Sequence, residues 1–216
     1  DAVRQVSEGT SLTYSMIVPP GVEVHSYRPT PKQTAQIVDS KMLFYSADTI
    51  ETWVSNLSVT TTEIINVHDN LFEDEHNHRL YHQHLVALDD HDHEHGVHFW
   101  TSPAHFMMEI DMVAEKLSTI DSENTTLFLS NADQYKTAIT STSEMFINDI
   151  QSLNQPQVFF VGHNALEDFG EYFGLDIIPL VDDIKPDADI TPLELAELVD
   201  AIVASDTTYL FVEELV

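Results

Sequence analysis

Histidine is the residue type whose number and placement in this chain most clearly indicate chemistry. The 216 residues include 12 histidines but only 8 lysines and arginines. Three of them, His25, His98 and His163, lie at the ends of predicted strands or in predicted strand-to-helix loops. Ligands of open α/β sheets bind at the carboxyl ends of strands, so these side chains could converge in one crevice and hold a metal ion. The alternative is three unrelated loop histidines, each with a satisfied hydrogen bond.

Seven further histidines occupy residues 69–96, where the apolar pattern disappears and eight acidic residues accompany them. They are His76, His78, His82, His84, His91, His93 and His95. Such a tract binds zinc, nickel or copper without fixed geometry, and a loop of this length is usually functional or disordered. The alternation at residues 91–95 also fits a metallohydrolase site, which is the enzyme hypothesis. His105 lies within the first turns of a predicted helix, a position that favours a structural or solvent-facing role. The pattern around His68 assigns that residue no role.

The composition excludes several classes of protein. The formal net charge is −29, from 37 acidic residues, and such a chain repels nucleic acid and anionic membranes. The chain has no cysteine, which excludes disulfide scaffolds, thiolate zinc sites and cysteine nucleophiles. It has no run of about 18 apolar residues, the length that a membrane-spanning helix needs.

Apolar periodicity and Pro-containing helix starts divide the chain into alternating strands and helices. The first part predicts strands at 11–18, 42–46 and 64–67 and helices at 31–40 and 48–57. A helix at 103–120 and one of about 25 residues ending at 150 follow, the second being close to 40 Å long at about 1.5 Å per residue. The last part predicts strands at 158–161, 175–180 and 208–212 and helices at 164–173 and 192–202.

This order predicts an α/β fold with two lobes, each with a central, mainly parallel sheet flanked by helices. We expect an N-terminal lobe at 1–122, a long rigid linking helix at 123–153 and a C-terminal lobe at 154–216. The last predicted strand is followed at once by the end of the chain, so we expect the C-terminal lobe to be truncated. We therefore expect an internal fragment whose export or lipid signal lies upstream.

Several motifs, in order along nearly the whole chain, resemble the metal-binding solute-binding proteins of bacterial ABC importers, the zinc/manganese group called solute-binding protein family 9. They are PPGVEVHSYRPTP at 19–31, HFWTSP at 98–103, GHNALEDFGEYFGL at 162–175, TPLEL at 191–195 and FVE at 211–213.

The resemblance implies an extracytoplasmic protein, periplasmic or lipid-anchored, that captures one metal ion between its lobes and delivers it to an ABC permease. It implies a monomer that does no chemistry on its ligand, and the metal ligands His25, His98 and His163. By comparison with the family, the first strand of the N-terminal lobe is expected to be missing upstream. The fourth ligand of the family is commonly an Asp that would lie beyond Val216. Some zinc members use water or a Glu next to the first histidine, where this chain has Val24, with Glu23 one residue further away.

The histidine-rich loop resembles that of zinc-specific members, and three imidazoles suit zinc better than manganese. Zn²⁺ is therefore the expected ion. A manganese-binding or adhesin member of the same family and the metallohydrolase with His91, His93 and His95 remain as alternatives. Because only neutral imidazole binds metal, we expect affinity to fall as the pH drops through about 6.5.

Overall fold

The computed structural model describes residues 1–72, 96–152, 157–181, 191–205, 207 and 209–213. The chain forms two compact units, of which the first contains residues 1–97 and 107–139 and the second residues 98–106 and 140–215. The seven histidines of the acidic tract lie outside the described residues. Among the helices of the described residues, none combines the length and apolar character that crossing a bilayer requires.

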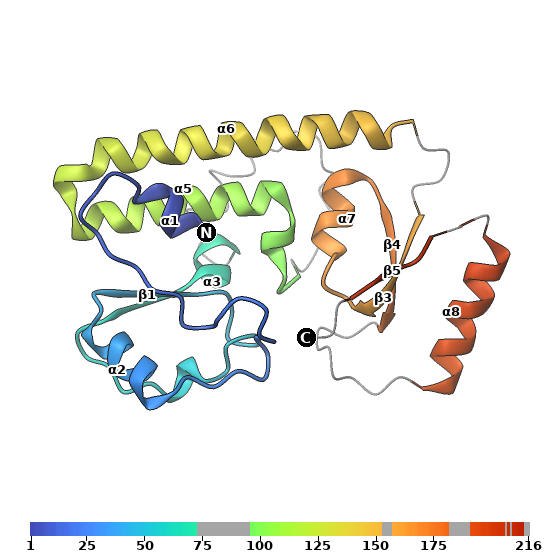
Figure 1. The fold of residues 1–216 in the computed structure, drawn as a ribbon, viewed down its shortest axis with the longest axis horizontal. Coiled ribbons are helices and arrows are strands. Elements are labelled where there is room, and N and C mark those ends of the chain that lie inside the picture. Colours follow the sequence, from blue (N-terminus) through green and yellow to red (C-terminus); the bar gives the residue numbers. More distant parts are fainter. Residues whose placement is uncertain (73–95, 153–156, 182–190, 206, 208, 214–216) are drawn as a thin grey trace. The chain divides into compact units, whose positions relative to one another are not determined.

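The first unit contains a two-stranded parallel sheet. Strand β1 (Met42–Tyr45) pairs with β2 (Glu63–Asn66), as the alternation predicts. Helix α2 (Pro31–Asp39) precedes β1 and begins with a capping box, in which Thr30 Oγ accepts from the Gln33 backbone N–H. Helix α2 lies beside the sheet strand β1 (Figure 1). Ile37 of α2 joins Leu43, Trp53 and Val54 in one buried cluster, and this burial holds α2 to the sheet.

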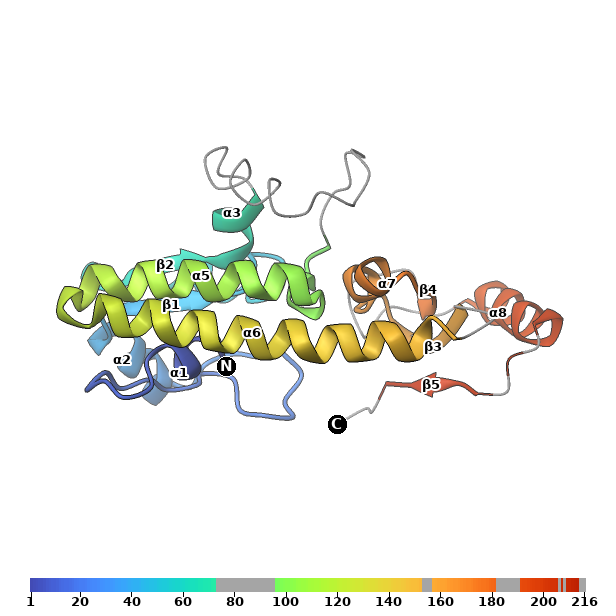
Figure 2. The same cartoon turned by 90° about the horizontal axis from the view of Figure 1, so that it is seen from above.

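The remaining helices of this unit are α1 (Ala2–Val6), α3 (Val67–Phe72) and the parts of α5 (Pro103–Ile120) and α6 (Thr125–Ile150) that belong to it. Helices α5 and α6 run side by side (Figures 1 and 2), and Lys136 Nζ lies 2.5 Å from Asp111 Oδ1. The Asn131 side chain donates to the Val6 carbonyl at 2.9 Å and thereby fixes α1. Helix α6 is continuous over 26 residues, which confirms the long helix expected from the spacing.

Two elements expected in this unit are absent from the structure. Residues 11–18 form no strand, and the Ile17 carbonyl accepts side-chain hydrogen bonds from Tyr27 and Gln33 in place of a neighbouring strand's N–H. Residues 48–57 form turns and a short 3₁₀ helix, η1 (Val54–Asn56), although the apolar positions Ile50 and Trp53 are buried as the pattern implies. The apolar spacing therefore predicted burial correctly and backbone conformation wrongly.

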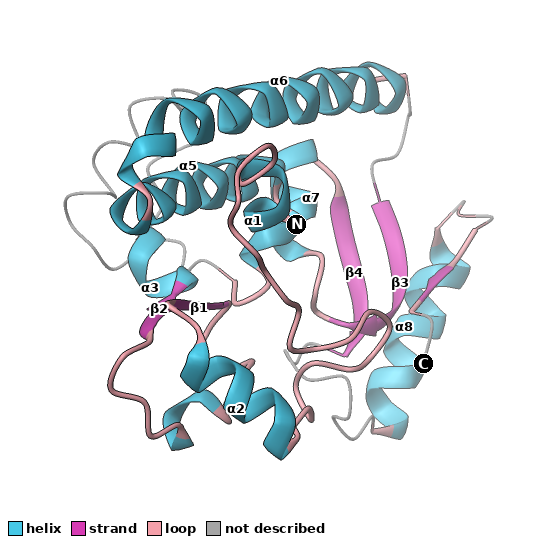
Figure 3. Ribbon diagram, turned by 60° about the vertical axis from the view of Figure 1, so that its left-hand side comes forward, coloured by secondary structure: helices cyan, strands magenta, loops and turns pink. Residues whose placement is uncertain are grey.

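The second unit is built on a three-stranded parallel sheet in the order β4-β3-β5 (Figure 3). The strands are β3 (Gln157–His163), β4 (Asp176–Val181) and β5 (Phe211–Val212). Helix α7 (Glu167–Phe173) connects β3 to β4, and α8 (Pro192–Ala204) lies between β4 and β5 in the chain. Both units thus have the parallel α/β architecture that the alternation of elements predicts.

Helix α7 is seated closely on β4 because its fourth residue, Gly170, has no side chain. A Cβ at Gly170 would lie 2.6 Å from Ile177 Cγ1 and 2.8 Å from the Leu175 carbonyl oxygen. Phe146 of α6 packs edge-to-face on Phe173 with a ring-centroid distance of 4.7 Å. These contacts fix the helix that begins just after His163.

Candidate metal centre

His98 is held at the start of the second unit by a short 3₁₀ helix, η2 (Phe99–Thr101). The Thr101 backbone N–H and hydroxyl both donate to the His98 carbonyl, at 3.0 and 2.9 Å. Phe99 is fully buried and anchors the turn, and η2 packs against α7. His98 itself has a relative exposure of only 6%. The local fold therefore fixes both the backbone and the surroundings of this imidazole.

His163 is the last residue of β3, at the carboxyl end of the parallel sheet. It is 7% exposed, and its ring centroid lies 5.1 Å from that of His98. The two residues are 65 positions apart in sequence, and each offers a ligand nitrogen within 4.8 Å of the other's. Two buried imidazoles so close together are suited to bind one metal ion, since each supplies a lone pair in its neutral form. The structure thus brings together two of the three expected ligands within one unit.

A carboxylate contacts the far side of the His163 ring. Glu213, the residue after β5, places Oε2 2.8 Å from His163 Nδ1 and 3.3 Å from the His163 backbone nitrogen. Glu213 is the last residue of the FVE motif at 211–213, but that motif predicted no role for its carboxylate. Glu213 directly follows β5, which pairs with β3, the strand that ends at His163. This placement at neighbouring strand ends could have indicated that Glu213 lies near His163.

His25 belongs to the first unit and lies in a loop, so the expectation that it follows a strand is wrong. Its backbone N–H donates to Glu23 Oε1 at 2.6 Å, and the Ser26 N–H donates to Glu23 Oε2 at 2.7 Å. Burial acts to raise the pKa of Glu23, but the hydrogen bonds from Ser26 and His25 outweigh it and lower that pKa. The Glu23 carboxylate is thus engaged with the backbone and shapes the loop that carries His25.

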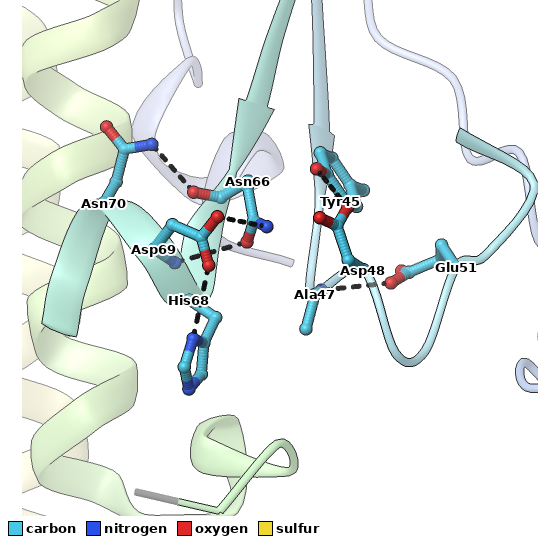
Figure 4. A network of polar contacts seen from close by, with 8 residues as sticks. All are labelled: Tyr45, Ala47, Asp48, Glu51, Asn66, His68, Asp69 and Asn70. Carbon is cyan, nitrogen blue, oxygen red and sulfur yellow. Dashed lines mark hydrogen bonds and ion pairs between the residues drawn. The ribbon is translucent and has the colours of Figure 1, made fainter. Parts of the chain in front are cut away.

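A network of polar contacts lies at the carboxyl ends of β1 and β2 (Figure 4). The buried Glu51 carboxylate accepts hydrogen bonds from the backbone nitrogens of Ser46 and Ala47, and burial raises its pKa. The Asn66 side-chain amide donates to Asp69 Oδ2 at 2.8 Å and accepts from the Asp69 N–H at 3.2 Å. These groups fix the loops after the strands.

The two remaining described histidines each face an aspartate. His68 Nδ1 lies 3.5 Å from Asp69 Oδ1, at the beginning of α3. His105 Nδ1 lies 3.2 Å from Asp168 Oδ1 in the second unit, with both side chains largely buried. This pair bridges α5 and α7, so His105 has the structural role that its helical position favoured.

Comparison with known proteins gives a family for the whole chain. Residues 1–216 match the family described as ZnuA, zinc-uptake complex component A periplasmic. The zinc-binding lipoprotein AdcA of Streptococcus pneumoniae is 25% identical over 223 residues, which cover 98% of this chain and 42% of AdcA. The chain therefore spans less than half the length of that relative.

Another relative is named for a different ion. The manganese-binding lipoprotein MntA of Halalkalibacterium halodurans is 23% identical over 95% of this chain and 64% of its own length. Among solved structures, the laminin-binding protein Lbp of Streptococcus pyogenes matches all of this chain and 75% of its own, with a TM-score of 0.78 at 20% identity. This structural likeness confirms the α/β fold class.

Proposed function

Because the chain belongs to the ZnuA family of zinc-uptake components, we propose that it captures a zinc ion with His25, His98 and His163 and delivers it to an ABC permease. The observation that carries the proposal is the buried pair of His98 and His163, whose rings are 5.1 Å apart. His25, in a loop of the first unit shaped by Glu23, would supply the third imidazole. The protein would then act outside the cytoplasm, in the periplasm or anchored at the cell surface, without chemistry on its cargo.

Zinc is favoured over manganese by the type of ligand. The described part of the candidate site offers imidazole nitrogens, which suit zinc, whereas manganese favours sites with more oxygen ligands. The relatives named above include one zinc-binding and one manganese-binding lipoprotein, so selectivity has to be measured. We expect the protein to bind zinc much more tightly than manganese.

The test is a competitive zinc titration against a chromophoric chelator. We expect one tight site in the wild type and a large loss in each of His25→Ala, His98→Ala and His163→Ala. The loss should exceed the roughly 100-fold that marks the upper range for residues that merely orient a ligand. His68→Ala is the matched control, because His68 is a half-buried histidine outside the proposed ligands, and it should bind as the wild type does.

A second variant separates this site from the histidine-rich tract. Residues 73–95 are replaced by a short Gly/Ser linker, which leaves α3 intact because that helix ends at Phe72. If the tight site survives this replacement, the tract is accessory. If tight binding is lost here but kept in the three His→Ala variants, zinc binds to the tract and the proposal is wrong. Zinc-dependent hydrolysis of an ester or phosphate that disappears with the tract would favour the hydrolase alternative.

A further inference from the structure

The contact between Glu213 and His163 determines which tautomer of the neutral imidazole is favoured. An ionised carboxylate only accepts hydrogen bonds, so at the 2.8 Å contact Nδ1 carries the proton. In the neutral imidazole with its proton on Nδ1, Nε2 holds the lone pair that a metal ion requires. Metal-binding histidines commonly donate their second N–H to a carboxylate in this manner, which fixes the tautomer and the ring orientation.

The backbone around this contact is built to bring the carboxylate close. The Glu213 backbone N–H donates to the Val161 carbonyl at 3.0 Å and continues the pairing of β5 with β3. Between Val161 and His163 stands Gly162, where a Cβ would lie 2.7 Å from Glu213 Oε2 and 2.9 Å from Glu213 Cβ. Such a Cβ would also lie 2.7 Å from Phe160 Cε1, and real Cβ atoms essentially never approach so closely, so a side chain at position 162 would displace the side chains of Glu213 and Phe160.

We propose that Glu213 is a positioning residue of the metal site, which holds His163 as the Nδ1–H tautomer and presents Nε2 to the ion, with Gly162 providing the space. This inference rests on the proposed zinc-binding function. It makes Glu213 a partner of a ligand and not a ligand itself, because its Oε2 is already engaged with Nδ1 and the His163 backbone.

The test compares Glu213→Ala, Glu213→Gln and Gly162→Ala in the zinc titration described above. Glu213→Ala removes the acceptor and should weaken zinc binding by roughly 10–100-fold. Glu213→Gln keeps a carbonyl oxygen that can accept from Nδ1–H, so it should recover most of the loss. Gly162→Ala keeps the carboxylate but displaces it, and should resemble Glu213→Ala. The matched control is Glu171→Ala, which removes an exposed glutamate of the same unit.

A spectroscopic measurement separates positioning from a general effect on folding. In ¹⁵N-histidine-labelled protein, the long-range ¹H–¹⁵N spectrum reports which nitrogen of His163 carries the proton, with His163→Gln used for assignment. The wild type and Glu213→Gln should show the Nδ1–H tautomer, with zinc on Nε2. Glu213→Ala should show a mixture of tautomers without zinc. If Glu213→Ala does not fold, the Glu213→Gln and Gly162→Ala spectra still decide the question.

Several results would overturn the inference. Wild-type affinity in Glu213→Ala would show that the carboxylate does not support the site. An equal loss in Glu213→Ala and Glu213→Gln, together with the loss of one oxygen from the zinc X-ray absorption spectrum, would make Glu213 a direct ligand. If the wild type binds no zinc tightly, or if His98→Ala binds as tightly as the wild type, the proposed function itself fails.

Discussion

Replacing Glu109 with glutamine should stabilise the first unit at alkaline pH and leave it unchanged in acid. Glu109 lies on α5 beside the fully buried Ile110, and desolvation by burial raises the pKa of its carboxyl from 4.5 to about 7. The folded state therefore binds the proton more tightly than the unfolded state. Folding stability must then fall as the pH rises from 4.5 to about 7, and the whole penalty is present above that range.

The size of the effect follows from the two pKa values. One pKa unit corresponds to about 1.4 kcal/mol, so the difference between 4.5 and about 7 sets an upper value of about 3 kcal/mol. Glutamine is neutral at every pH and avoids this penalty, although its amide needs a hydrogen-bond partner in the same place. We therefore expect Glu109→Gln to raise the free energy of unfolding by about 1–3 kcal/mol at pH 8, and by nearly nothing at pH 4.5.

Urea unfolding at several pH values measures this difference. Trp53 reports on the first unit if Trp100, which belongs to the second, is replaced by phenylalanine in every variant. Glu115→Gln serves as the control, because it removes an exposed carboxylate from the same helix. A stability gain of the same size at pH 4.5 and pH 8, or a loss at pH 8, would refute the assignment of the penalty to the desolvated Glu109 carboxylate.

Three further substitutions test the packing and capping that support the two units. Gly170→Ala should destabilise the second unit by about 1–3 kcal/mol in thermal unfolding, because the new Cβ would overlap Ile177. An unchanged unfolding temperature would show that α7 and β4 can move apart without cost. Glu51→Ala should cost about 1–3 kcal/mol and accelerate amide exchange at Ala47, whose N–H loses its acceptor. Thr30→Ala removes a capping box and should cost about 1 kcal/mol in urea unfolding, and an unchanged midpoint would contradict the cap.

The sequence best predicted those elements for which the local residue pattern and the contacts with distant parts of the chain favour the same structure. The long helix ending at Ile150 and the parallel strands β3 and β4 are of this kind. Residues 11–18 have strand-like residues, but a strand also needs a neighbour, and side chains of Gln33 and Tyr27 bind its backbone instead. No local pattern reveals that competition.

For the candidate site, the sequence identified His98 and His163, which the structure brings together, and it overlooked Glu213. The placement of that carboxylate depends on the pairing of β5 with β3, a contact between residues 50 positions apart. Residues 48–57 show the same limit, since their apolar spacing specified which side chains are buried. The Glu51 carboxylate there accepts hydrogen bonds from the Ser46 and Ala47 backbone N–H groups, which favours a turn in place of a helix. The β-branched residues of this segment also have a low helix propensity.

The shortness of β5 has a consequence for how long the site persists between metal-binding events. Among the residues that the structure describes, Phe211 and Val212 pair with β3 and the Glu213 N–H adds one further hydrogen bond, whereas five residue pairs join β3 to β4. Local opening of β5 should therefore cost less free energy than opening of β4, and its amides should exchange with solvent sooner. Each opening would release the Glu213 carboxylate from His163. Bound zinc and a closed β5 would then stabilise each other, so that zinc slows hydrogen exchange at Val212 and Glu213 more than at the centre of β3.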